Sequence, residues 1–460
     1  MTQNIPPREP AVEPPSDADA TAAATAPDPE PGAASPDRGV TPGWKTDFRI
    51  QLVIAGLATL AVNATKPIVT YQALALGAST LEVGLVQSAF SIIPAFTAVA
   101  VGRLVDRGSE AKYLAIALLL FSVGTLAAAN AATLLILAAA QVFTGMGHIL
   151  NLVAGQAMIA NRGPREGREG RFGSYSVAAS FGQLSGPVIA GLIAGSATVG
   201  AVGAGVALGG YELANGQRVF LAAGTATFIG AMLATVIFAR NRERDARMAE
   251  GRPPETSEPM LSAALRVLRR SGMPAAMAVS IIVISVVDVV IAYLPVYGEE
   301  AGLAVAIVGF LLSVRAGASL ISRVFMGRTI AWLGRERTLA VSMTMAGIGI
   351  GAIPFTDSVP VLVVLMALAG FGLGVCQPMT IAWVAQRSPR AERATAIGVR
   401  LTGNRTALML VPATMGAIAG TAGIMAIFWV MGIALLGGAL LAARTPFDEL
   451  RDLRDAPTDA

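Results

Sequence analysis

Residues 102–112 read GRLVDRGSEAK, a charged stretch that separates two long apolar runs. A second stretch of this kind, GRTIAWLGRER at residues 327–337, also separates two apolar runs and begins 225 residues later (327 against 102). Other residues keep the same spacing: Gly145 and Gly147 match Gly370 and Gly372, Gly173 matches Gly398, Pro187 matches Pro412, and Gly191 matches Gly416. One spacing over several apolar runs indicates a duplicated half.

The composition excludes most soluble and enzymatic classes. Of the 460 residues 54% are hydrophobic and only 14% are charged, which is far less charge than a soluble chain of this length carries. Cys376 is the single cysteine and His148 the single histidine, so no disulfide framework, thiolate metal site or two-histidine mechanism is available. No Gly-x4-Gly-Lys-Ser/Thr loop is present. We therefore expect no metal, no cofactor, no nucleic-acid partner and no catalytic site.

The apolar runs predict an all-α integral membrane protein with twelve transmembrane helices. A helix needs about 20 residues to cross the hydrocarbon layer of a bilayer. The predicted spans are 48–70, 81–102, 113–130, 133–157, 173–195, 219–239, 274–297, 303–325, 338–355, 359–384, 395–418 and 423–443.

The arginines predict the orientation of these spans. One set of alternate loops is rich in basic residues, at 103–112, 162–171, 240–270, 328–337 and 387–393, whereas the other set has almost none. Basic loops remain in the cytoplasm. Both termini of a twelve-span chain would then be cytoplasmic, in the inner or plasma membrane.

The same pattern divides the chain into five parts. We expect a disordered tail over 1–43, a six-helix bundle over 44–239, a cytoplasmic linker over 240–272, a second bundle over 273–443 and a polar tail over 444–460. Within the linker, Met260, Leu261, Ala264, Leu265 and Leu268 share one face of a predicted interfacial helix. The segment 196–215 has no counterpart in the second half.

These motifs resemble those of the major facilitator superfamily over roughly residues 48–443. Gly102-x3-Asp106-Arg107 resembles the loop motif between helices 2 and 3, and Gly327-x6-Gly334-Arg335 resembles its second-half copy, with Ala331 where that copy has an acid. Gly182-x3-Gly186-Pro187-x3-Gly191 resembles the helix 5 motif of the drug/proton-antiporter-like members with twelve helices. The resemblance implies two six-helix bundles that rock about a substrate site between them.

The resemblance also implies a conformational latch. Asp106 would face the positive N-terminus of helix 11, near Thr395, and would release it when the halves rock. A solvated loop charge is the alternative for Asp106. Because Ala331 cannot replace that carboxylate, we expect Asp106→Asn to impair transport more than any substitution of Ala331.

Ionisable residues at membrane depth are expensive and mark functional sites. Asp288, Arg315 and Arg405 fall near the middle of predicted spans, and Lys66 falls in the outer third of its span, from which it can also reach the surface. For Asp288 three roles stay open: an ion pair with Arg315 or Arg405, a proton carrier, or a ligand for a cationic substrate. Further candidates for substrate binding or coupling are Asn63 (the match of Asp288 in the repeat), His148, Asn151, Tyr293 and Gln377.

The sequence as a whole predicts a monomeric secondary active transporter that exports a small organic solute in exchange for protons. An uptake symporter or facilitator is the alternative, favoured by Gln141, which stands where many proton-coupled members carry arginine. A membrane enzyme or a non-transporting sensor is a remote alternative, since neither a catalytic constellation nor an output domain is present. The excess of cations over acids inside the spans favours an anionic or zwitterionic solute.

Overall fold

The computed structural model describes residues 43–164, 167–194, 213–250, 265–388, 393–445 and 447. Twelve long helices occupy this part of the chain and confirm the all-α membrane fold. In chain order the first six are α2 (Trp44–Ala75), α3 (Thr80–Arg107), α4 (Glu110–Ala129), α5 (Leu134–Asn161), α6 (Arg168–Ala194) and α7 (Leu213–Glu250). The others are α9 (Met273–Glu300), α10 (Val305–Leu333), α11 (Arg335–Gly351), α12 (Val359–Gln386), α13 (Arg393–Ala422) and α14 (Met425–Arg444), with a short 3-10 turn, η1 (Ile353–Phe355), after α11.

Among the described residues, eleven of these helices are long and apolar enough to cross a membrane. Helix α13 is not among them, because Arg400, Asn404 and Arg405 interrupt its apolar sequence. It nevertheless packs lengthwise against α3 and α9. Helix α13 is therefore part of the bundle. Its polar residues are accommodated because it packs between other helices.

The charged stretches are less loop-like than the sequence predicts. Helix α3 continues to Arg107 and α4 begins at Glu110, so only two residues of the first stretch lie between helices. The hydroxyl of Ser109 accepts a hydrogen bond from the backbone N–H of Lys112 and caps α4. In the second stretch Gly334 alone, at a φ of +79°, separates α10 from α11. Polar turns extend these helices past the apolar layer, so hydropathy alone places their ends too early.

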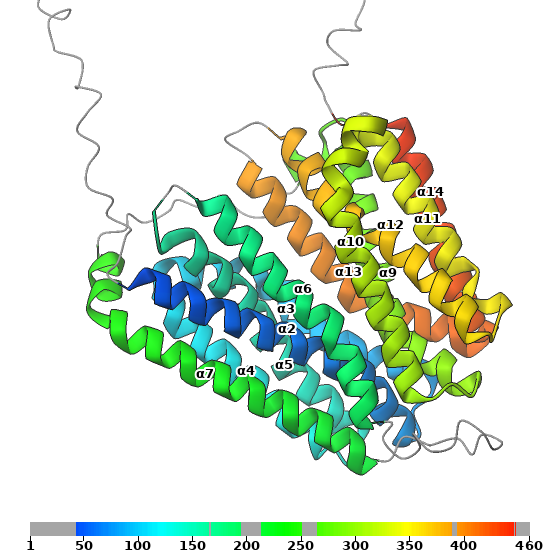
Figure 1. Cartoon of the computed structure of the whole chain (residues 1–460), viewed down its shortest axis with the longest axis horizontal. Helices are drawn as coiled ribbons and strands as arrows, with labels where there is room; N and C mark the ends of the chain where they lie inside the picture. Colours follow the sequence, from blue (N-terminus) through cyan, green and yellow to red (C-terminus); the bar gives the residue numbers. More distant parts are fainter. Residues whose placement is uncertain are drawn as a thin grey trace, which may run out of the picture.

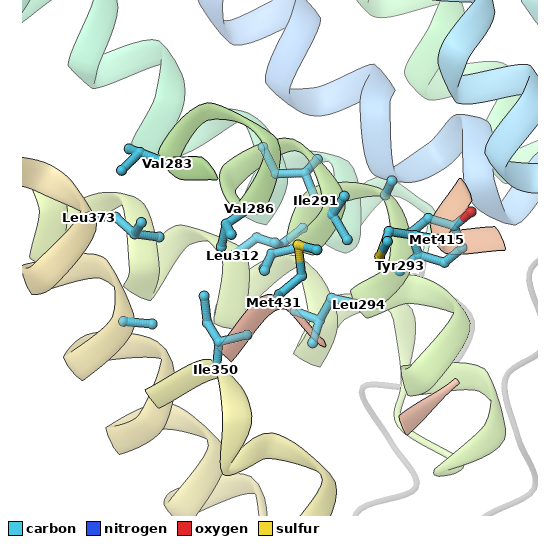
Figure 2. Packing of buried hydrophobic residues seen from close by; sticks show 14 of the residues in the cluster. Val283, Val286, Ile291, Tyr293, Leu294, Leu312, Ile350, Leu373, Met415 and Met431 are labelled. Carbon is cyan, nitrogen blue, oxygen red and sulfur yellow. The ribbon is translucent and has the colours of Figure 1, made fainter. Parts of the chain in front are cut away.

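The chain forms two halves, α2–α7 and α9–α14, whose helices are inclined to one another (Figure 1). In the second half, α9 is the central helix and is buried along most of its length. Figure 2 shows Val283, Val286 and Leu294 of α9 packed with Leu312 of α10 and Ile350 of α11. The apolar side chains on most faces of α9 suit this central place, and Asp288 is the one acid among its buried residues.

The two halves touch closely at one end of the molecule, here called the sealed end. There α3 packs against α13 and α6 against α10. The carbonyl of Pro412 lies against Gly84 of α3, and the carbonyl of Pro187 lies against Gly309 of α10. Gly309 lies 225 residues after Gly84, and Pro187 lies 225 residues before Pro412. The seal is thus built twice, from equivalent residues of the two repeats.

Toward the opposite end, here called the open end, the helices of the two halves diverge (Figure 1). A Cβ atom added to any of five glycines there would meet no other atom within 4 Å; these are Gly102, Gly170, Gly173, Gly327 and Gly398. This end carries the arginine-rich loops. The two halves therefore make close backbone contacts at the arginine-poor end and diverge toward the arginine-rich end (Figure 1).

The glycines of the helix 5 motif are packing positions. A Cβ added to Gly182 would lie 2.5 Å from the backbone nitrogen of Leu60, and one added to Gly186 would lie 2.8 Å from the carbonyl oxygen of Leu60. Gly191 instead faces Ala306 on α10, with 3.0 Å to its Cα atom. Small residues at this spacing let backbones approach closely. The motif therefore joins α6 both to α2 within its half and to α10 across the interface.

A buried charge cluster, which the sequence did not reveal as such, joins the first-half helices at the open end. Arg162 lies 3.6 Å from a carboxylate oxygen of Asp47 on α2 and 3.5 Å from one of Glu110 on α4. Arg240 of α7 lies 3.4 Å from Asp47, which also accepts a hydrogen bond of 2.9 Å from Asn241. Charges at this depth are stable only when they are paired. The cluster fixes α2, α4, α5 and α7 as one body.

Several expectations fall wholly or partly on residues outside the described part. These residues are 1–42 of the first tail, 196–212 of the segment 196–215, 251–264 of the linker, and 446 and 448–460 of the last tail. Within the linker, residues 265–268 are helical, with Leu265 and Leu268 exposed and Val267 buried. The side chains of Asp106 and Arg107 are also outside the described part, so the latch stays a prediction.

Candidate functional site

An ion pair joins the two halves deep inside the molecule. The ammonium of Lys66 on α2 contacts a carboxylate oxygen of Asp288 on α9, and the two side chains are only 15% and 11% exposed. The same ammonium lies 4.9 Å from the centre of the Phe90 ring on α3, close enough for a cation–π interaction.

The partner of Asp288 is therefore Lys66, where the sequence suggested Arg315 or Arg405. The repeat spacing matches Asp288 with Asn63, which lies one turn away from Lys66, so spacing alone did not identify the pair. Lys66 does not extend toward the membrane surface, because an acid lies opposite it. Arg405 is buried as well and interacts electrostatically with Asp288.

Hydrogen bonds between the halves lie on the sealed side of this pair. The hydroxyl of Thr70, one turn along α2, donates to the carbonyl of Ala292 at 2.8 Å. The hydroxyl of Tyr293 donates to the carbonyl of Pro412 at 2.7 Å and lies 3.3 Å from the carbonyl of Thr80. Tyr293, which the sequence suggested as a cavity-lining residue, is wholly buried in this seal.

Beside the ion pair lies a small cavity between the halves, with a volume of about 60 Å³. Of the residues predicted for the site, Asn63, Arg315 and Gln377 line it. The other lining residues, which sequence reasoning did not assign to the site, come from α6, α9, α10 and α12; they are Gln183, Val287, Ile291, Ala316, Ser319, Arg323 and Leu373.

The cavity wall is cationic. Arg315 is 8% exposed, and its buried Nε has no hydrogen-bond partner among the described residues. Two turns away on the same face of α10, Nε of Arg323 donates to the carbonyl of Gly374 at 3.2 Å. None of the lining residues is acidic. A buried guanidinium with free donors is suited to bind an anion.

His148 and Asn151 of α5 lie outside the cavity wall. The His148 ring lies 5.5 Å from the ring of Phe90 and 6.5 Å from that of Phe121. Its Nδ1 and the side-chain oxygen of Asn151 are buried without a hydrogen-bond partner among the described residues. His148 also feels the charges of Arg405 and Lys66. Phe90 thus lies close to both His148 and Lys66 of the ion pair.

The remaining membrane-depth arginine, Arg400 of α13, is bound within its own half. Its Nη2 donates to the hydroxyl of Thr380 on α12 at 3.0 Å. No cluster of potential metal ligands occurs in the described residues. Polar recognition in the cavity therefore rests on arginine, amide and hydroxyl groups.

Two repeated six-helix halves with a polar cavity between them, open at one end, define the class of membrane transporters that work by alternating access. The family model of the Major Facilitator Superfamily matches residues 52–335 and 299–457. The chain belongs to this superfamily, whose members are secondary transporters of small solutes and not enzymes.

Solved structures agree with this fold at low sequence identity. A bacterial homologue of the human lysosomal transporter Spinster, inward-facing and occupied, is 16% identical, with a TM-score of 0.66 over 90% of this chain and 99% of that one. A POT family transporter in complex with 5-aminolevulinic acid is 12% identical, with a TM-score of 0.65 over 86% of this chain and 95% of that one. A point mutant of the nucleoside transporter NupG is 13% identical, with a TM-score of 0.65 over 86% of this chain and 98% of that one. No curated protein matches the sequence.

Proposed function

We propose that the protein exports a small organic solute in exchange for protons, and that Asp288 is the residue through which the protons act. The observation that carries this proposal is the buried Lys66–Asp288 ion pair, whose two members belong to different halves. The arginine-rich open end is the cytoplasmic end in this proposal, so the conformation described is inward-facing.

Proton coupling follows from the position of the pair. Lys66 and Asp288 meet next to the seal between the halves. If the halves part at the sealed end, the pair must break and leave two charges unpaired inside the membrane, which costs several kcal/mol. A proton on Asp288 removes the negative charge and lowers that cost. In the outward-facing state Asp288 therefore takes up a proton from outside, and re-forming the pair in the inward-facing state releases that proton to the cytoplasm.

The direction of transport rests on the helix 5 motif. Gly182, Gly186 and Gly191 pack α6 against both α2 and α10, in the pattern that resembles the drug/proton-antiporter-like members. Packing alone is compatible with either direction. Gln141 favours the alternative, an uptake symporter or facilitator; its side chain is buried in α5.

A pH-sensitive dye trapped in proteoliposomes separates these functions. We expect inward solute flux to move protons out and make the lumen alkaline, whereas a symporter would make it acidic and a facilitator would leave the pH unchanged. Asp288→Asn should abolish the dye response. The orientation is tested in cells with a membrane-impermeant maleimide and Gly327→Cys in a Cys376→Ser background; labelling from outside the cell would place the open end outside.

A further inference from the structure

The two repeats place different chemistry at equivalent positions around the centre of the molecule. Adding 225 to a residue number gives the match in the second half, so Asn63 corresponds to Asp288, Lys66 to Ile291 and Phe90 to Arg315. The structure supports the last match directly. Gly145 lies against the carbonyl of Phe90, and its match Gly370 lies against the carbonyl of Arg315.

At the first of the two equivalent sites, the cation Lys66 is neutralised. Lys66 has the carboxylate of Asp288 from the other half and the ring of Phe90 from its own half. The matching residues Asn63, Ile291 and Arg315 all line the cavity. In the cavity, Ile291 stands in the place of Lys66, the cation Arg315 stands in the place of Phe90, and the neutral amide of Asn63 stands in the place of the acid.

We infer that the solute of this transporter carries a carboxylate or another small anionic group. This group binds Arg315 at the position where an acidic side chain of the protein would otherwise pair with it. Arg315 is 8% exposed as a whole residue, and its buried Nε lacks a partner among the described residues. An uncompensated charge at this depth is costly. A ligand carboxylate can satisfy it with charge-assisted hydrogen bonds.

Neighbouring groups fit such an anion and a polar body attached to it. Arg323 lies two turns nearer the open end, so a second cation lines the route inward. Ser319, between the two arginines, and the amides of Gln183 and Gln377 offer neutral hydrogen bonds. Ile291 and Leu373 add apolar side chains to the cavity wall. These groups suit a small organic anion better than an amine, because no acidic residue lines the cavity.

Thermal-shift titration of the purified full-length protein tests this inference without a gradient. The probes are benzoate, succinate and inorganic phosphate, with benzylamine as the cationic counterpart of benzoate, all at constant ionic strength. We expect at least one anion to raise Tm in a saturable way and benzylamine to leave it unchanged. Stabilisation by benzylamine alone, or by none of the anions, would overturn the inference. The set of effective anions distinguishes a carboxylate site from a phosphate site.

Two variants locate the anion. Arg315→Gln removes the proposed partner, and Asn63→Asp places an acid where the cavity lacks one, with almost no change in volume. Both should raise the Kd of the effective anion at least about tenfold. Arg400→Gln, a buried arginine outside the cavity, should leave that Kd unchanged. If Arg315→Gln does not fold, Asn63→Asp alone decides; anion binding equal to that of the wild type in a folded Asn63→Asp protein refutes the site.

This inference deepens the proposed transport function, because it takes the cavity as the place where the solute binds. The two can fail separately. Asp288→Asn should keep anion binding and lose the proton response. A wild-type protein that moves protons with a cationic or neutral solute would refute the anion site and leave proton coupling intact. Anion binding without any proton response would refute proton coupling and leave the anion site intact.

Discussion

Neutralising either member of the Lys66–Asp288 pair should shift the protein away from the conformation described here. Removing one partner of a buried ion pair costs about 3–5 kcal/mol. The two side chains are 15% and 11% exposed, so we take the lower value, about 3 kcal/mol. If the pair exists only while the sealed end is closed, Asp288→Asn or Lys66→Gln should change the ratio of the two conformations about 150-fold.

Two spin labels at the open end report that ratio. Gly170 on α6 and Gly327 on α10 are exposed, and a Cβ added to either meets no atom within 4 Å. Cysteines at these positions, with Cys376 replaced by Ser, give a pair of labels across the opening. Double electron–electron resonance in lipid nanodiscs should show mainly the long label-to-label distance when the ion pair is intact. In either single variant the population with the short distance should increase.

The double variant distinguishes this ion pair from two independent charges. Lys66→Gln with Asp288→Asn leaves no unpaired charge, so its effect should be clearly smaller than the sum of the two single effects. Arg400→Gln, whose hydrogen bond lies within one half, should leave the distances unchanged. Additive effects, or single variants with wild-type distance distributions, would refute the reasoning.

Three further predictions concern the packing within and between the two halves. Arg162→Met should leave the buried Glu110 without a cation and Asp47 with only Arg240 and Asn241, cost about 3 kcal/mol and lower Tm, whereas Arg168→Met at an exposed position should not; an equal Tm for both variants would contradict the cluster. Tyr293→Phe should remove about 1 kcal/mol from the seal and shift the spin-label distances by a factor of about five in population; unchanged populations would exclude a role in sealing. Gly309→Ala should open the sealed end by pushing on a proline carbonyl, measured by maleimide labelling of that end, while Gly327→Ala at the open end should have no effect; similar labelling in both would count against the seal.

The fold could be predicted from the sequence because its signals are long and repeated. Apolar length predicts helices, and the 225-residue spacing predicts two halves. Helix ends were placed less well, since polar turns such as those near Arg107 and Glu110 stay helical outside the apolar layer. The polar α13 was nevertheless predicted as a span, because residues 395–418 are on balance an apolar run of sufficient length.

The site could be predicted only in part. Burial cost singled out Lys66, Asp288 and Arg315, whose side chains have low exposure in the structure, but partner choice depends on how helices from different halves face one another. Sequence spacing contains no such information, which is why an arginine was expected opposite Asp288. Tyr293 was misplaced for the same reason, since its hydroxyl turns to α13 and not to the cavity. Gln183 and Arg323 carried no signal stronger than that of other polar residues.

The contribution of Asp288 to coupling is tested most directly by measuring two fluxes in the same proteoliposomes. One is solute exchange at equal pH on both sides, which needs rocking but no net proton movement. The other is solute accumulation driven by an imposed pH gradient. We expect Asp288→Asn to retain exchange and to lose gradient-driven accumulation. Accumulation by Asp288→Asn at the wild-type level would contradict the account, because protons would then act through another residue.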